Sequence, residues 1–227
     1  MKALSIKFFC ISFIAAIALL NSGCDKKSGE PFSGQIGAFK RYPWERFHLT
    51  YEYSGDVRGT EELFVSGYGK YEKHLSNYEI ISPQGLRTSA KGAITRFIDV
   101  YTFDLTQNRC IHQRMDNLDS LYHLEGKDIP TPQEYLETEM TRNYFKNVGT
   151  DTLGGKTATR WQQIDGGLTL WVWNCILLRK HIISEDGVYE MNINSIDSLW
   201  AVDTSKFIVP QGLPITEASQ IHAPDPN

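Results

Sequence analysis

The side chains best suited to chemistry are scattered along this sequence of 227 residues. Its histidines are His48, His74, His112, His123, His181 and His222. No two of them have the spacing of metal ligands on one element. His112 and His123 flank a turn that carries two aspartates; this turn could hold a metal, but a solvated hairpin explains it better. We therefore expect no metal site.

Other catalytic patterns are equally weak. Glu61 and Glu62 are adjacent, and adjacent strand residues point to opposite faces, so the pair cannot cooperate as acid and base. The glycine-rich run 149–157 resembles a phosphate loop, but Thr150 stands where that motif needs glycine, and the run follows a helix instead of opening one. No serine has the surroundings of a nucleophile elbow. We expect a protein that is not an enzyme and uses no cofactor.

The N-terminus has the pattern of a secretory signal peptide. Lys2 and Lys7 precede an apolar run over 8–20, which is shorter than the roughly 20 residues that span a bilayer. The following Ser22-Gly23-Cys24 resembles the lipobox of bacterial lipoproteins, although Asn21 replaces the usual leucine. This resemblance implies cleavage after residue 23 and a lipid on Cys24. An uncleaved anchor and an ordinary signal-peptidase site are the alternatives.

The expected mature chain begins with a tether over residues 24–44, whose polar, Gly-, Ser- and Pro-containing start favours a flexible spacer. No run of acids follows Cys24, so we expect a domain that faces the periplasm. We expect the lipid anchor in the outer membrane in preference to the inner membrane. Removing residues 1–23 leaves 204 residues with a formal charge of −6. This mild acidity without a basic stripe argues against nucleic acid as a partner.

Period-two hydrophobicity dominates the rest of the chain and predicts an antiparallel sheet. Phe47, Leu49 and Tyr51 alternate with polar residues in the clearest strand. Glycine-containing turns at 165–167 and 185–187 predict hairpins. The expected strands cover residues 46–53, 62–65, 68–73, 94–105, 110–115, 157–164, 168–173, 175–183, 188–195 and 198–202.

One helix is predicted after Thr131, which forms a capping-box pattern with Glu134. Its stripe of Leu136, Met140, Tyr144 and Val148 would pack on the sheet, or serve as a mobile lid, and Gly149 would end it.

The aromatic content could carry a function, since Phe, Trp and Tyr make up 12% of the chain. Residues 168–173 are apolar on both faces, which indicates either a closed core or the wall of an apolar cavity. The candidate lining residues are Phe47, Leu49, Tyr51, Trp161, Trp171, Trp173 and Trp200. Cys110 and Cys175 could pair as a disulfide, or remain two buried thiols.

Three segments carry a family resemblance. The Tyr101–Asp104 spacing, the run from Trp171 to Arg179, and the closing Phe207-Ile208-Val209-Pro210-Gln211-Gly212 are similar to those of the half-barrel lipoproteins. This group includes the periplasmic carrier and the outer-membrane receptor of lipoprotein sorting. The resemblance covers about residues 45–212. It implies a curved antiparallel sheet around helices, whose apolar concave face receives acyl chains in the sorting proteins.

We therefore predict an α+β protein: a strongly curved antiparallel sheet, or half-barrel, over residues 45–212, with one main helix on its concave side. A flexible tail would cover 213–227. The expected function is a membrane-anchored binding module for an acyl chain or another apolar molecule. The alternative is a structural or interaction lipoprotein with a filled core and an envelope protein as its partner.

Overall fold

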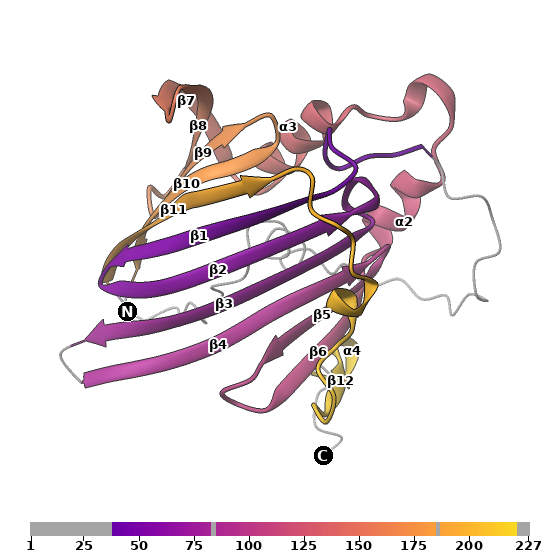
Figure 1. The fold of residues 1–227 in the computed structure, drawn as a ribbon. Coiled ribbons are helices and arrows are strands. Elements are labelled where there is room, and N and C mark those ends of the chain that lie inside the picture. Colours follow the sequence, from indigo (N-terminus) through magenta and orange to yellow (C-terminus); the bar gives the residue numbers. More distant parts are fainter. Residues whose placement is uncertain (1–37, 83–84, 185–186, 222–227) are drawn as a thin grey trace, which may run out of the picture.

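The computed structural model describes residues 38–82, 85–184 and 187–221, and its strands form one curved, open sheet (Figure 1). The twelve strands lie in the order β12-β6-β5-β4-β3-β2-β1-β11-β10-β9-β8-β7. They are β1 (Phe47–Gly55), β2 (Val57–Ser66), β3 (Tyr71–Ser82), β4 (Gly85–Arg96), β5 (Asp99–Asp104), β6 (Arg109–Arg114), β7 (Phe145–Leu153), β8 (Lys156–Gln163), β9 (Leu168–Trp173), β10 (Ile176–Ser184), β11 (Gly187–Asp197) and β12 (Ile215–Glu217).

The two faces of this sheet follow from the alternation in β1. Phe47, Leu49, Tyr51 and Tyr53 are all buried, and we call their side the inner face. His48 stacks on Phe64 of β2 on the opposite side, the outer face. Directly paired residues share a face, so the registers extend this assignment across the sheet. The strand prediction for 46–53 is confirmed.

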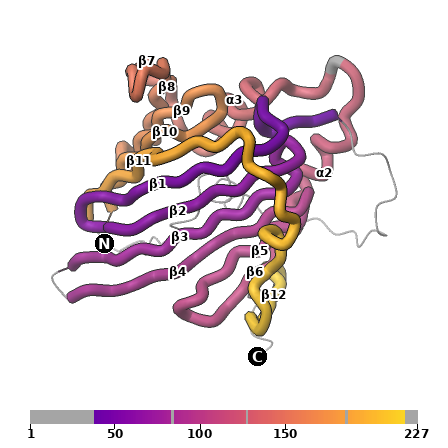
Figure 2. The backbone as a smooth tube through the Cα atoms, viewed as in Figure 1, coloured from indigo at the N-terminus to yellow at the C-terminus, as the bar shows by residue number. Residues whose placement is uncertain are grey.

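The outer face is covered by the segment that follows β11. This segment crosses the sheet and ends in β12, as the tube in Figure 2 shows. Its Phe207, in the 3-10 helix η3 (Thr204–Phe207), joins a buried apolar cluster with Phe64, Ile94, Phe103 and Cys110. Gly92 makes room for this packing, because a Cβ there would lie 2.4 Å from the Phe103 ring.

The inner face is covered at one end of the strands by helices and by residues 38–46 (Figure 1). The helices are α2 (Asp116–Tyr122) and α3 (Pro132–Arg142), with the 3-10 turn η2 (Gly126–Asp128) between them in the chain; a second 3-10 turn, η1 (Gly67–Gly69), joins β2 to β3. A short helix, α4 (Ala218–Ile221), follows β12. No helix among the described residues is long and apolar enough to cross a membrane.

The predicted α+β class is wrong, because the protein is mostly β, with 57% of it in strands. The sheet is also mixed instead of antiparallel, since β12 runs parallel to β6. The expected main helix is short. Its capping box at Thr131 and Glu134 is confirmed, but the helix ends at Arg142. Tyr144 has a φ of 61°, outside the helical range, and the next residues form β7.

Several expected boundaries also need correction. The strand expected over 94–105 is two strands, because Phe97 turns the chain with a φ of 56°. Residues 198–202 form no strand. Phe39 and Tyr42 are buried, so the end of the expected tether belongs to the domain. The expected tail contributes β12 and α4. The signal peptide and Cys24 lie outside the described residues.

Candidate functional site

The inner face carries a buried row of charged side chains where an apolar core was expected. Arg41 Nη2 lies 2.9 Å from Glu72 Oε1, and Glu72 Oε2 lies 3.6 Å from His74 Nε2. On the other side of the ring, His74 Nδ1 lies 3.6 Å from Glu61 Oε1. All four side chains are at most 6% exposed. Removing charged groups from water is costly, so a buried row of this kind requires that its charges compensate one another.

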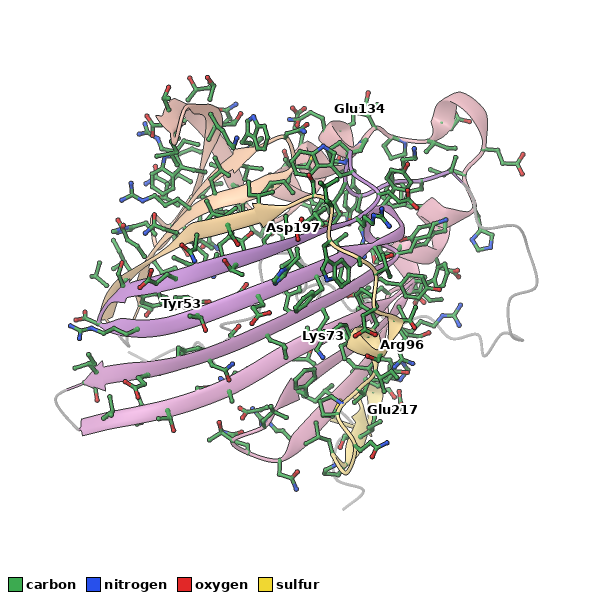
Figure 3. All side chains as sticks on the ribbon, in the orientation of Figure 1. Tyr53, Lys73, Arg96, Glu134, Asp197 and Glu217 are labelled. Atoms are coloured by element: carbon green, nitrogen blue, oxygen red, sulfur yellow. The ribbon has the colours of Figure 1, made fainter. Side chains whose placement is uncertain are left out.

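Glu61 is held in its ionised form by this row. Its Oε2 accepts hydrogen bonds from Tyr53 Oη at 2.6 Å and Ser76 Oγ at 3.0 Å. Burial alone would raise the pKa of Glu61, but His74, the charge of Lys180 and the Tyr53 bond lower it to about 2. Tyr53, labelled in Figure 3, therefore anchors a carboxylate and not a neutral acid.

His74 is biased toward its protonated form. Burial lowers its pKa, but the carboxylates of Glu61 and Glu72 on either side outweigh burial and raise it above the ordinary value. Glu61 comes from β2 and Glu72 from β3. The pairing of these two strands sets Leu63 opposite His74, so His74 lies on the same face as Leu63 and Glu61. Alternation in β3 then puts Glu72, His74 and Ser76 on the same face.

A cavity of about 40 Å³ lies above this row. Its walls are mostly apolar, and its floor is polar. The lining residues are Tyr42, Leu49, Tyr51, Glu61, Leu63, His74, Leu136, Cys175, Ile176 and Leu177. The two His74 ring nitrogens face Glu61 and Glu72 at 3.6 Å, whereas Tyr42 Oη is buried and has no hydrogen-bond partner among the described residues. Such atoms are rare in folded proteins, and each one calls for an explanation.

Tyr42 is positioned by the chain segment that precedes β1. The Arg41 backbone N–H donates to the Tyr68 carbonyl at 3.0 Å, which fixes this segment on the turn after β2. Gly69, with a φ of 93°, lets the segment approach, since a Cβ there would lie 2.9 Å from the Tyr42 ring. Phe47 packs edge-on against that ring, with centroids 5.0 Å apart.

The roof of the cavity comes from α3 and from the turn between β9 and β10. Leu136 faces the cavity from α3, and Met140, one turn further on, is fully buried. Asn174 and Cys175 form the turn with φ values of 47° and 62°. Positive φ is uncommon for cysteine, and here it brings Cys175 to the cavity beside the helix.

The cavity offers hydrogen-bond donors and no activated nucleophile. Burial, and then the charge of Glu72, raises the pKa of Tyr42 well above its usual range; burial and Glu61 do the same for Tyr51. Burial, and then Glu137, raises the pKa of the Cys175 thiol to about 11. All three groups keep their protons at neutral pH, and a nucleophilic cysteine would need the opposite shift.

The structure separates the predicted lining residues. Leu49 and Tyr51 line the cavity. Phe47 and Trp161 belong to the same inner core without lining it. The role of these residues in binding stays a prediction.

The other three tryptophans lie elsewhere. The Trp171 indole N–H donates to Asp151 Oδ2 at 2.7 Å, and its ring lies under the Arg179 guanidinium. Trp173, at the end of β9, packs against Trp44. Trp200 packs against Phe64 on the outer face, 5.4 Å between ring centroids. None of these three lines the cavity, although Trp171 and Trp173 also pack against the inner core.

The cysteines and histidines also take definite places. Cys110 and Cys175 are both free, one under the segment after β11 and the other beside α3, so the predicted pairing is absent. His112 pairs with Asp99 and Glu217, each at 2.9 Å, which joins β12 to the sheet. The described residues contain no group of three or more His, Cys, Asp or Glu side chains that could hold a metal.

The sequence reasoning missed Tyr42, Glu61 and His74. A signal for one of them was present. Glu61 shares its strand face with Leu63 and Val65, and an acid at such an inward position is unusual. In agreement with the opposite faces expected for the adjacent acids, Glu61 is buried while Glu62 pairs with His48 on the outer face.

Comparisons with known proteins leave the family open. No protein-family model matches the chain, and no curated protein matches it. Among solved structures, an uncharacterized conserved protein from Thermus thermophilus has a TM-score of 0.44 at 9% identity, over 77% of this chain and 91% of that one. LprF from Mycobacterium bovis has a TM-score of 0.33 at 10% identity, over 72% and 90%.

A third structure, PNGF-II, has a TM-score of 0.41 at 11% identity and covers 78% of this chain, which spans only 32% of PNGF-II. Scores at this level support no inference about function, so the site is interpreted from its own geometry.

Proposed function

We propose that this protein is a lipid-anchored binding protein of the cell envelope, which holds an amphipathic small molecule between the inner face of its sheet and α3. The polar end of the ligand would lie on the floor of the cavity, and its apolar part would lie against the leucine and isoleucine walls. The unpartnered, buried hydroxyl of Tyr42 in an apolar-walled cavity carries this proposal.

The energetic argument is direct. A buried polar atom without a partner costs about 1–3 kcal/mol. Tyr42 Oη is such an atom, and Tyr42 lines the cavity, so a polar group bound there could pair with it. A ligand that supplies this group would recover the cost on binding.

The size of the cavity limits what fits without movement. About 40 Å³ accommodates a group near the size of one water molecule, whose share of the liquid is about 30 Å³. A longer apolar part must therefore displace Leu136, and with it α3.

Chain length tests this proposal. We expect the affinity of straight-chain amphiphiles for residues 24–227, with Cys24→Ser to keep the protein in solution, to rise with each added methylene by up to about 0.8 kcal/mol. Leu136→Asp should abolish the rise, while Leu105→Asp, at an exposed site just past the end of β5, should leave it. An affinity that does not depend on chain length would refute an apolar wall.

The anchor forms a separate part of the proposal, and it depends on the lipobox-like Ser22-Gly23-Cys24. We expect metabolic labelling with a fatty acid to mark the wild-type protein and not Cys24→Ala. Labelling of the Cys24→Ala protein would overturn the lipid anchor. Removal of the domain by a protease added to intact cells would overturn its periplasmic orientation.

The small cavity also favours a second function. An inner face filled by Phe47, Trp161 and Met140 suits a structural or interaction lipoprotein with an envelope protein as its partner. Native mass spectrometry of the gently extracted protein separates the two, because a bound small molecule adds mass only in the first.

A further inference from the structure

The polar groups around the cavity are mostly donors, and this restricts the chemistry of a ligand. Tyr42 and Tyr51 contribute phenol hydroxyls, whereas the His74 ring nitrogens are already directed at Glu61 and Glu72. The acceptor in the lining is the Glu61 carboxylate. Its Oε2 already accepts from Tyr53 and Ser76, and its Oε1 faces His74. A ligand group that accepts hydrogen bonds therefore fits better than one that donates them.

The charges of the buried row point the same way. Three groups can be cationic, namely Arg41, His74 and Lys180, and all three are buried. Two carboxylates, Glu61 and Glu72, oppose them. With His74 protonated, as its position between two carboxylates favours, the row and Lys180 beside Glu61 together carry one positive charge in excess. An uncompensated buried charge is costly, so a bound anion would stabilise the row.

We infer that the polar end of the ligand is a carboxylate, which the Tyr42 hydroxyl binds as a hydrogen-bond donor and the nearby positive charge of His74 attracts. This inference rests on the proposed function. A carboxylate supplies lone pairs for several donors at once, and its negative charge balances the excess positive charge of the row and Lys180. Its size suits a cavity of about 40 Å³, with the apolar chain leaving between α3 and the turn at Cys175.

Three probes with the same chain distinguish a carboxylate from other polar ends. Octanoate, octanol and octylamine would be titrated calorimetrically into residues 24–227 with Cys24→Ser. We expect octanoate to bind at least tenfold more tightly than octanol, and octylamine to bind more weakly than both. Equal binding of acid and alcohol would overturn the carboxylate while the proposed function stands, and so would tightest binding of the amine.

Binding of none of the probes would reject the proposed function, and the inference with it. These failures are therefore distinguishable.

Two variants test the two groups named in the inference, the Tyr42 hydroxyl and the His74 imidazolium. Tyr42→Phe removes the hydroxyl and keeps the ring, and His74→Gln keeps a donor without the charge. Each variant should weaken the binding of octanoate at least tenfold, and His74→Gln should change the affinity for octanol less than threefold. The matched controls are Tyr68→Phe and His48→Gln, which lie outside the cavity.

If His74→Gln fails to fold, Tyr42→Phe still decides the outcome, because it removes an atom that has no partner to lose. Unchanged octanoate affinity in Tyr42→Phe would remove Tyr42 from the site and overturn the inference.

Discussion

Each face of the sheet carries a buried cluster, yet the two clusters are built in different ways. On the outer face, Phe64, Ile94, Phe103, Cys110 and Phe207 close against one another with apolar surfaces. On the inner face, equally buried positions are occupied by a row of charged side chains, and a cavity lies beside this row. None of the buried atoms without a partner in the described residues belongs to the outer cluster. The outer contact thus serves stability, and the inner one has the features of a site.

The largest effect should follow from opening the closed face. Phe103 is 1% exposed, so Phe103→Ala should lower the free energy of unfolding by about 3–5 kcal/mol, since it leaves a cavity. Octanoate affinity should not change, because the cavity lies on the other face. Urea denaturation measures the loss, and Leu105→Ala, at an exposed position, is the control. A tolerated Phe103→Ala would show that the outer cluster is loosely packed.

The next effect concerns the charged row. The pKa of Glu61 falls from 4.5 to about 2 on folding, so its contribution is present above about pH 4.5 and is lost as the pH falls toward 2. A shift of this size corresponds to on the order of 3 kcal/mol. We expect the stability of the wild type to fall over this range more steeply than that of Glu61→Gln.

Glu62→Gln, one residue away on the outer face, should follow the wild-type curve. Parallel curves for wild type and Glu61→Gln would mean that Glu61 is not ionised in the folded protein.

A smaller effect is expected at the tryptophan strand. Trp171 is only half-buried, between Asp151 and Arg179, so Trp171→Ala should cost about 1–2 kcal/mol and leave octanoate binding unchanged. Trp161, which is 6% exposed in the inner core, is the matched comparison. Trp161→Ala should lower the free energy of unfolding by about 3–5 kcal/mol. Thermal unfolding of the two variants side by side would measure this. Equal costs would contradict the half-buried position of Trp171 between Asp151 and Arg179.

The sequence predicted the strands better than it predicted what lies between them. Alternation located β1 and the meander from β8 to β11, because one face of each strand is dry. The turn at Phe97 was missed, since a phenylalanine with positive φ has no signature in its neighbours. The helix was overextended because Tyr144 and Val148 continue the apolar spacing after the helix has ended.

The candidate site was harder to foresee for a physical reason. Hydrophobic patterning identifies apolar side chains as core and polar ones as solvated. In β3 the relation is reversed: Glu72 and His74 point inward, whereas Leu75 belongs to the cluster on the other side. Tyr42 comes from a segment that composition assigned to a tether. Only the tertiary contact at Gly69 brings it to the cavity.

The most direct test of the inner face as a binding site is Tyr42→Phe, with stability and octanoate affinity measured on the same sample. Because the hydroxyl is buried without a partner, its removal should leave the free energy of unfolding unchanged or raise it by up to about 1 kcal/mol. Octanoate affinity should fall at least tenfold. A variant that loses about 1 kcal/mol or more of stability and still binds octanoate as the wild type does would contradict this account, because the hydroxyl would then serve the fold and not a ligand.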